Sequence, residues 1–270
     1  MNTTHPILCE MPSGEAAARL RVACKTEGVP EIFLSIQGEG RNVGQIRSFL
    51  RLSGCNLQCR WCDTPYTWNW EGTHWPGLDD APNPLPKYRQ AREMLSLTVP
   101  DLAARLSTLS APGLVITGGE PLVQMRGLLS LIRALKAADP ALLIEIETNG
   151  TIAPGAELAG LVDLFMVSPK LDHALNREGR ALRAGALAAL AALPAAAFKF
   201  VAAAAADVAE VAILAREHSI APGRIYIMPL GTSSDALIRT GAALIDSVIA
   251  HGFNYSDRLH IHLFGEKRGT

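Results

Sequence analysis

Ser53-Gly-Cys-Asn-Leu-Gln-Cys-Arg-Trp-Cys-Asp-Thr64 contains three of the chain's five cysteines, Cys55, Cys59 and Cys62. A disulfide framework would use an even and dispersed set of cysteines, so this triplet indicates metal ligands. A structural zinc site takes four tetrahedral ligands, and only His74 could complete one here. A [4Fe–4S] cube also normally takes four thiolates. Three cysteines therefore predict a cluster whose fourth iron accepts an external ligand.

The composition is that of a globular protein that buries a full core. The chain has 270 residues, 49% of them hydrophobic, and a net charge of −1 that gives no reason to expect nucleic acid as a partner. The most apolar stretch, 184–198, contains Gly185 and Pro194 and ends before Lys199, so we expect no membrane span. No basic and apolar leader is visible in residues 1–10, and we expect a cytoplasmic protein. Cys9 and Cys24 have no predicted role.

Strand and helix patterns alternate along the chain, which predicts an α/β fold with a parallel sheet and right-handed crossovers, as a barrel or an open sheet. The apolar runs predict strands at 32–36, 47–52, 113–117, 142–147, 163–167, 196–201, 224–228 and 258–263. The helical patterns between them cover 99–109, 126–138, 180–193, 207–218 and 233–250.

Polar motifs follow the predicted strands at their carboxyl ends. They are Thr117-Gly-Gly-Glu-Pro121, Glu147-Thr-Asn-Gly150, Ser168-Pro-Lys170, Met228-Pro-Leu-Gly231, and His260 or His262. Barrel enzymes place their active sites at this face, so the coincidence favours a barrel.

We expect an N-terminal extension at 1–29 and one domain at 30–270, with a Trp-rich insertion at about 65–97. This insertion is either a lid beside the cysteines or a solvent-facing loop pinned by its aromatic residues.

The cysteine motif resembles that of the radical S-adenosylmethionine (SAM) superfamily, in which an aromatic residue precedes the last cysteine, as Trp61 does here. Gly118-Gly-Glu-Pro121 resembles the superfamily's GGEP motif. The resemblance implies a partial or modified (β/α)6-type TIM-like barrel of the radical SAM type. It also implies that SAM chelates the open iron and is cleaved reductively to methionine and a 5′-deoxyadenosyl radical.

Further motifs narrow the resemblance to the 7-carboxy-7-deazaguanine synthase family, from about Glu31 to the C-terminal end. They are Ser35-Ile-Gln-Gly-Glu-Gly40, Phe49-Leu-Arg-Leu-Ser-Gly-Cys-Asn56, Trp61-Cys-Asp-Thr64, Thr117 to Pro121, Glu147 to Gly150 and Ser168 to Lys170. The resemblance implies conversion of 6-carboxy-5,6,7,8-tetrahydropterin to 7-carboxy-7-deazaguanine with loss of ammonia, a lyase reaction on the route to queuosine. It also implies catalytic use of SAM, assistance by Mg²⁺, a flavodoxin or ferredoxin as electron donor, and a homodimer.

The resemblance assigns roles residue by residue. The cluster ligands would be Cys55, Cys59 and Cys62. The SAM site would comprise Trp61, Cys62, Asp63, Gly119, Glu120, Glu147, Ser168, Pro169 and Lys170. The substrate site would comprise Ile36, Gln37, Gly38, Glu39, Arg51, Thr117 and His260. Thr64 would bind Mg²⁺ or, alternatively, act as the N-cap of a short helix.

Two of these residues are open to more than one interpretation. Arg51 lies in the apolar run Phe49-Leu-Arg-Leu52, so it needs a ligand or an acidic neighbour to pair with. Counting back from Gly265 favours His260 over His262, although both would share one face of the predicted strand at 258–263.

Three alternatives to the synthase differ in what they need. A radical SAM activating enzyme needs a groove for a polypeptide, and a related small-molecule enzyme needs another substrate. A non-catalytic zinc or iron–sulfur module needs neither Gly118-Gly-Glu-Pro121 nor Ser168-Pro-Lys170. Met228-Pro-Leu-Gly-Thr-Ser233 and the Trp-rich insertion depart from the family pattern.

Overall fold

The computed structural model describes residues 18–174 and 182–270. Its strands join in one sheet in the order β11-β10-β9-β8-β7-β6-β4-β1-β2, with β3 paired to β4 and β5 paired to β1. The strands are β1 (Arg19–Thr26), β2 (Val29–Pro30), β3 (Ile32–Ile36), β4 (Ile46–Leu52), β5 (Met94–Thr98), β6 (Gly113–Gly118), β7 (Leu143–Thr148), β8 (Leu164–Val167), β9 (Ala196–Ala202), β10 (Ile225–Pro229) and β11 (Asn254–Tyr255). The α-helices are α2 (Gln90–Glu93), α3 (Val99–Leu106), α4 (Met125–Ala138), α5 (Ala156–Leu161), α6 (Ala184–Ala191), α7 (Ala205–Glu217), α8 (Ser234–Ala250) and α9 (Leu259–Phe264).

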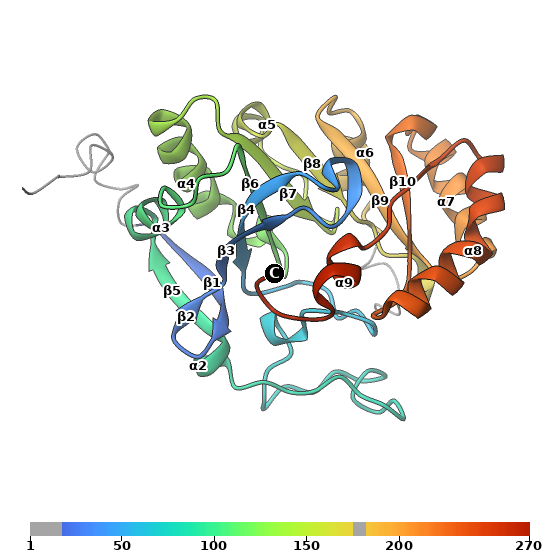
Figure 1. Ribbon diagram of the computed structural model, residues 1–270, viewed down its shortest axis with the longest axis horizontal. Helices are drawn as coiled ribbons and strands as arrows, with labels where there is room; N and C mark the ends of the chain where they lie inside the picture. The colour runs from blue at the N-terminus through green and yellow to red at the C-terminus, as the bar shows by residue number, and fades with distance from the viewer. Residues whose placement is uncertain (1–17, 175–181) are drawn as a thin grey trace, which may run out of the picture.

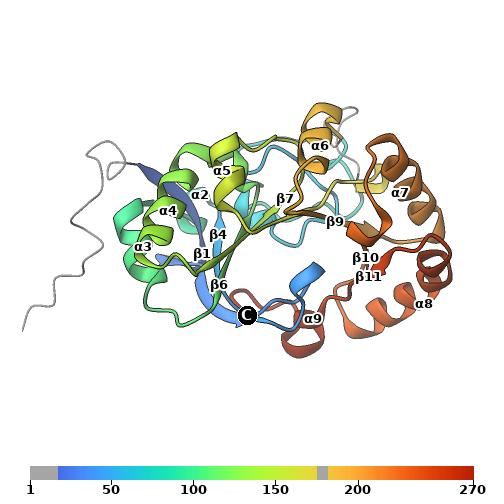
Figure 2. The same cartoon turned by 90° about the horizontal axis from the view of Figure 1, so that it is seen from above.

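The centre of the sheet is a run of parallel strands, β4-β6-β7-β8-β9-β10, with α3 to α8 following them in turn. Figure 2 shows the sheet bent into an arc, with these helices along its outer side and α9 on its inner side. The arc does not close, since its path ends at β11 and β2. The predicted partial (β/α)6 TIM-like barrel is therefore confirmed.

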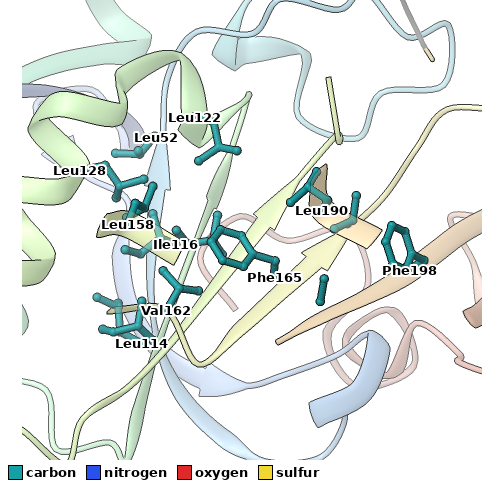
Figure 3. Packing of buried hydrophobic residues seen from close by; sticks show 14 of the residues in the cluster. Leu52, Leu114, Ile116, Leu122, Leu128, Leu158, Val162, Phe165, Leu190 and Phe198 are labelled. Carbon is teal, nitrogen blue, oxygen red and sulfur yellow. The ribbon is translucent and has the colours of Figure 1, made fainter. Parts of the chain in front are cut away.

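The core lies between the arc and its helices (Figure 3). Phe165 and Phe198 on neighbouring strands are fully buried, as are Leu114 and Ile116 on β6 and Leu128 on α4. Each such side chain contributes roughly 1.5–3 kcal/mol on leaving water. Helices on one side and the cavity residues on the other cover both faces of the parallel strands, which explains their nearly continuous apolar runs.

The N-terminal part of the chain enters the sheet before residue 30. β1 pairs antiparallel with β5 from Arg19↔Thr98 to Ala23↔Met94, and with β4 at Val22↔Leu52. Leu20 and Val22 point into the core while Arg19 and Arg21 are exposed, so the alternation that a half-buried strand needs is present. The boundary expected at residue 29 thus falls within paired structure, and residues 1–17 lie outside the described part.

The strand predicted at 258–263 is wrong, because this segment forms helix α9 (Figure 1). β11 takes the place beside β10 at the edge of the sheet. A short run that mixes apolar residues with histidines is compatible with a strand or a helix, and tertiary packing decides which of the two forms. The inference that His260 and His262 share one face therefore fails as well.

None of the helices in the described ranges is long and apolar enough to cross a membrane.

Candidate active site

A cavity of about 630 Å³ opens at the carboxyl ends of the parallel strands. All three cysteines of the triplet line it, together with most of the residues assigned to SAM, Mg²⁺ and the pterin. These are Ile36, Gln37, Gly38, Glu39, Arg51, Trp61, Asp63, Thr64, Thr117, Gly119, Glu147, Ser168, Lys170 and His260. The predicted site residues, which come from segments far apart in the sequence, therefore meet in one cavity.

Two residues of the predicted SAM set, Glu120 and Pro169, do not line the cavity. The Glu120 side chain is fully buried and accepts hydrogen bonds from the backbone N–H groups of Leu122 and Asn149 and from the Thr148 hydroxyl. Burial raises the pKa of Glu120. Its carboxyl group therefore organises the loops behind the cavity and does not line it, although the resemblance places Glu120 in the SAM site.

The two glycines of the GGEP motif allow the end of β6 to pack on the cysteine loop. A Cβ at Gly118, whose φ is +130°, would overlap the Leu52 carbonyl oxygen, and one at Gly119 would overlap that of Gly54. The Gly119 N–H donates to the Leu52 carbonyl at 3.0 Å and the Glu120 N–H donates to that of Gly54 at 2.9 Å. Only glycine permits this approach, which fixes the loop that begins at Cys55.

Cys59 is buried, whereas Cys55 and Cys62 are half-buried at the wall of the cavity. Burial, with Asp63 as the next cause, raises the pKa of Cys62 to about 12, and burial also raises the pKa of Cys55. Both are therefore neutral thiols that lose their protons on binding a cationic centre. The Leu57 N–H donates to Cys55 Sγ at 3.4 Å, and Trp68 Nε1–H donates to Cys62 Sγ at 3.3 Å.

The arrangement of the thiols fits a cube better than a zinc ion. In the described ranges, no group of three or more His, Cys, Asp or Glu side chains surrounds a single metal position. A zinc site needs all its ligands around one centre, whereas each thiolate of an iron–sulfur cube binds a different iron. The donor set is consistent with an iron–sulfur cluster.

Two cations and a histidine surround Glu39 on one side of the cavity. Lys199 and Arg258 both form ion pairs with its carboxylate, the second at 3.0 Å, and His260 Nε2 lies 3.7 Å away. Burial alone would raise the pKa of Glu39, but these cations hold it well below its usual range. Burial lowers the pKa of His260, which is therefore a neutral imidazole at pH 7.

Gln37 connects the carboxyl group of Glu147, which lines the cavity, to that of Glu145, which does not. Its Nε2 donates to Glu145 and to Glu147, both at 3.1 Å, and the Thr117 hydroxyl donates to Glu147 at 2.9 Å. Burial, followed by the nearby charge of Glu147, raises the pKa of Glu145 to about 7. The side-chain oxygen Oε1 of Gln37 accepts from the Glu39 N–H at 3.2 Å, so the side-chain amide of Gln37 is fixed at both ends.

The acidic neighbour expected for Arg51 is Glu31. Arg51 Nε donates to the fully buried Glu31 carboxylate at 2.9 Å, and the Tyr66 hydroxyl donates to the same carboxylate at 3.0 Å. The Arg51 side chain makes no other hydrogen bond with the described residues, so its terminal nitrogens are available to the cavity that it lines. Thr64 lies at the N-terminus of a 3₁₀ turn, Pro65–Thr67, but makes no side-chain cap hydrogen bond there.

Trp61 forms another corner of the cavity with the Ser168-Pro-Lys170 loop. The Trp61 indole N–H donates to His173 Nδ1 at 3.1 Å. Lys170 Nζ lies 5.4 Å from the centre of the Trp61 ring and donates to the Ser168 hydroxyl at 2.9 Å. These contacts place a cation and a hydroxyl beside the cysteine loop.

Sequence reasoning missed Lys199, Arg258 and Trp68. Lys199 is the one charged residue in the otherwise apolar strand β9, and a charge in a buried strand is a signal that it faces a partner. The sequence pattern places Arg258 at the start of a predicted strand and Trp68 in an insertion without a motif. Their roles depend on contacts with Glu39 and Cys62 that no local pattern contains.

Comparisons with known proteins agree with this geometry. A family described as a 4Fe-4S single cluster domain matches residues 36–188, more than half of the chain. The 7-carboxy-7-deazaguanine synthase of Pyrobaculum aerophilum is 35% identical over 89% of this chain and 96% of its own length. The chain belongs to the 7-carboxy-7-deazaguanine synthase family.

Another member of the synthase family, from Rhodopirellula baltica, is 34% identical and aligns over 98% of both chains. The crystal structure of QueE from Escherichia coli superimposes with a TM-score of 0.62, at 25% identity, covering 89% of this chain and 95% of that one. The resemblance to the family and the radical SAM type of fold are thus confirmed, and the match to a 4Fe-4S domain speaks against the zinc interpretation.

Proposed function

We propose that this protein is a 7-carboxy-7-deazaguanine synthase. It converts 6-carboxy-5,6,7,8-tetrahydropterin to 7-carboxy-7-deazaguanine with release of ammonia, in the biosynthesis of queuosine or related 7-deazapurines. The observation that carries the proposal is one cavity in which the cysteine triplet faces Gln37, Glu39, Arg51 and His260. A polypeptide-activating enzyme would have no use for such a closely spaced polar set around a small cavity.

The cysteine side of the cavity would hold the cofactors. Cys55, Cys59 and Cys62 would ligate a [4Fe–4S] cluster, and the SAM that binds beside it supplies a 5′-deoxyadenosyl radical when reduced. Lys170 and Ser168 would bind the polar groups of SAM, and Trp61 would pack against it. The other contacts proposed for SAM are Asp63, Gly119 and Glu147.

The pterin would occupy the side lined by Glu39 and Arg51. Glu39 is ionised and held by Lys199 and Arg258, so it presents a fixed acceptor to the N–H groups at the ring edge. Arg51, fixed through its Nε by Glu31, would pair with the carboxylate of the substrate. Gln37 and Thr117 would bind further ring atoms, and neutral His260 would offer one donor and one acceptor.

Mg²⁺ would bind at Thr64. One hydroxyl is a weak ligand, and Mg²⁺ keeps several waters while taking oxygens from its substrate, so a carboxylated pterin would complete the octahedron. Thr64 lines the cavity and makes no cap hydrogen bond, and its hydroxyl lies 3.8 Å from Cys62 Sγ, which keeps it beside the cysteine loop.

The test is an anaerobic assay of the reconstituted protein with a low-potential reductant, SAM, Mg²⁺ and 6-carboxytetrahydropterin. We expect 7-carboxy-7-deazaguanine and ammonia in equal amounts, with SAM regenerated. Glu39→Gln should lower kcat/KM for the pterin at least about tenfold, equivalent to one lost charge-assisted contact, without affecting cluster content. Glu71→Gln is the control, since Glu71 pairs with Arg89 at the surface.

Each failure of this assay has a defined meaning. SAM cleavage without a deazaguanine would show another small-molecule substrate on the same superfamily chemistry. One zinc per chain and no iron after anaerobic purification would refute the radical chemistry itself. Flavodoxin or ferredoxin as electron donor, and a homodimer, are carried over from the family, and reduction assays and light scattering would test them.

A further inference from the structure

Trp68 belongs to the Trp-rich insertion but contacts the cysteine triplet directly. Its side chain is only 4% exposed, and its indole N–H donates to Cys62 Sγ at 3.3 Å. The 3₁₀ turn Pro65–Thr67 brings it there, since the Trp68 backbone N–H closes that turn on the Pro65 carbonyl at 3.1 Å. Trp68 lies outside the family motifs, which give it no role.

The ring of Trp75 packs against the indole of Trp68. The two rings meet edge to face, with centroids 6.2 Å apart and planes at 62°. The indole nitrogen of Trp75 is itself buried and has no hydrogen-bond partner in the described part of the chain. The same segment therefore contains one tryptophan whose N–H donates to a cysteine sulfur and one whose N–H has no partner among the described residues.

The hydrogen bond at Cys62 has an electrostatic consequence. Hydrogen bonds to cysteine sulfurs are among the factors that set the reduction potential of an iron–sulfur cluster. A donor at a ligand sulfur stabilises the more negative, reduced state, and it does so more strongly in a buried setting of low dielectric. Cys55 receives donors from the Leu57 N–H at 3.4 Å and from Asn149 Nδ2 at 3.9 Å, and the Thr64 hydroxyl lies 3.8 Å from Cys62 Sγ. The shortest of these contacts, at 3.3 Å, comes from the Trp68 side chain, so substitution can remove it.

We propose that Trp68 is a positioning residue that acts through Cys62, and that its N–H bond to the Cys62 thiolate raises the reduction potential of the cluster. The proposal rests on the proposed function. The step concerned is a one-electron reduction: a low-potential donor gives one electron to the oxidised cluster, and no bond is formed or broken at Trp68. Its N–H makes an otherwise difficult reduction easier.

The experiment is an anaerobic redox titration of the reconstituted enzyme, followed by electron paramagnetic resonance of the reduced cluster. Trp68→Phe keeps an aromatic ring against Trp75 and removes only the N–H, so its midpoint potential should fall below that of the wild type. Trp75→Phe is the matched control and should leave the potential unchanged, because the N–H that it removes has no partner. An unchanged potential in Trp68→Phe, or an equal fall in both variants, overturns the proposal.

A second measurement on the unaltered enzyme covers the case in which Trp68→Phe does not take up a cluster. With ¹⁵N in the indole nitrogens, pulsed electron paramagnetic resonance of the reduced wild type should detect a nitrogen coupled to the cluster. Absence of this coupling overturns the proposal. Neither measurement uses the pterin, so a wild type that makes no deazaguanine while Trp68→Phe shifts the potential refutes only the proposed function.

Discussion

At the scale of single residues, the cavity depends on buried charges that have specific partners. Glu31 is fully buried and neutralises Arg51, whose side chain is 20% exposed. Glu31→Gln keeps the shape and removes the counter-charge of a largely buried cation, so we expect a loss of about 3 kcal/mol in the free energy of unfolding. Urea denaturation of the variant and the wild type measures this difference in the free energy of unfolding.

The control for this prediction is Glu71→Gln. Its partner Arg89 is 59% exposed, so water already screens the pair, and the change should stay within about 0.5 kcal/mol. Equal effects of the two substitutions would show that burial of the Arg51 pair has no energetic consequence.

Glu145 gives the protein a dependence of stability on pH. Its pKa of about 7 in the folded protein exceeds the ordinary value of 4.5 because the carboxyl group is buried and lies near the charge of Glu147. Hydrogen bonds from Asn42 and Gln37 and the charge of Lys199 lower this pKa, but by less than burial and Glu147 raise it. A raised pKa means that the folded state holds its proton more tightly than the unfolded one. The associated stability is present in full below about pH 4.5 and is lost as pH rises through 7.

Glu145→Gln removes this titration. We therefore expect the variant to gain stability relative to the wild type as pH rises from 5 to 8, by up to about 3 kcal/mol. Thermal unfolding of both proteins across this range measures the difference. A constant difference between them at every pH would contradict the assignment of Glu145 as the titrating group.

At the scale of elements, helix α9 places His260 and His262 in different surroundings. His260 lies beside Gly38 and Glu39, while His262 hydrogen-bonds Ser234 at 2.9 Å and Asp257 at 3.2 Å on the far side of the helix. A Cβ at Gly38 would overlap the His260 imidazole, and the Leu259 N–H donates to the Gly38 carbonyl at 2.9 Å. The Gly38 turn thus fixes where α9 begins and where His260 points.

Gly38→Ala should displace His260 and lower kcat/KM for the pterin about tenfold, or about 1.4 kcal/mol, mainly through KM. Steady-state kinetics at full cluster occupancy measures the effect. Gly160→Ala is the control, because a Cβ at this position of α5 meets nothing within 4 Å. His262→Ala should also leave KM unchanged, and a rise in KM equal to that of Gly38→Ala would contradict the orientation of α9.

The same elements mark how far the sequence predicts the fold. The parallel strands were predicted to within about two residues, because strands covered on both faces have long apolar runs that repeat between helices. β1 was missed although Leu20 and Val22 alternate with arginines, since its partners β4 and β5 are distant in sequence. α9 was mistaken for a strand because six residues are too few to show a period.

The candidate site was predictable where short motifs carry it and not where long-range contacts do. The motif residues line the cavity, apart from Glu120 and Pro169. Lys199 and Arg258 become site residues only because the fold brings them to Glu39.

At the scale of the whole molecule, three segments outside the barrel repeat meet beside its open side. Arg268 near the C-terminus lies with its guanidinium 3.5 Å from the centre of the Tyr66 ring and 5.7 Å from that of Tyr88. It also pairs with Glu93 at 2.7 Å, and its neighbour Gly269 accepts a hydrogen bond from Lys25 at 3.1 Å. Figure 1 shows the C-terminus lying near β3 and the segment that follows β4.

Arg268 therefore joins the C-terminal segment to the Trp-rich insertion and to β1. A desolvated cation–π contact contributes up to about 2 kcal/mol, and the Arg268 side chain is 30% exposed, so Arg268→Ala should cost about 1–2 kcal/mol. Because Tyr66 and Tyr88 hold the insertion, proteases should cleave residues 65–97 faster in this variant. Lys267→Ala removes an exposed neighbouring cation and should change neither quantity. Equal protection of the insertion in both variants would mean that the aromatic packing around Trp68 and Trp75 holds it without help from the C-terminal segment.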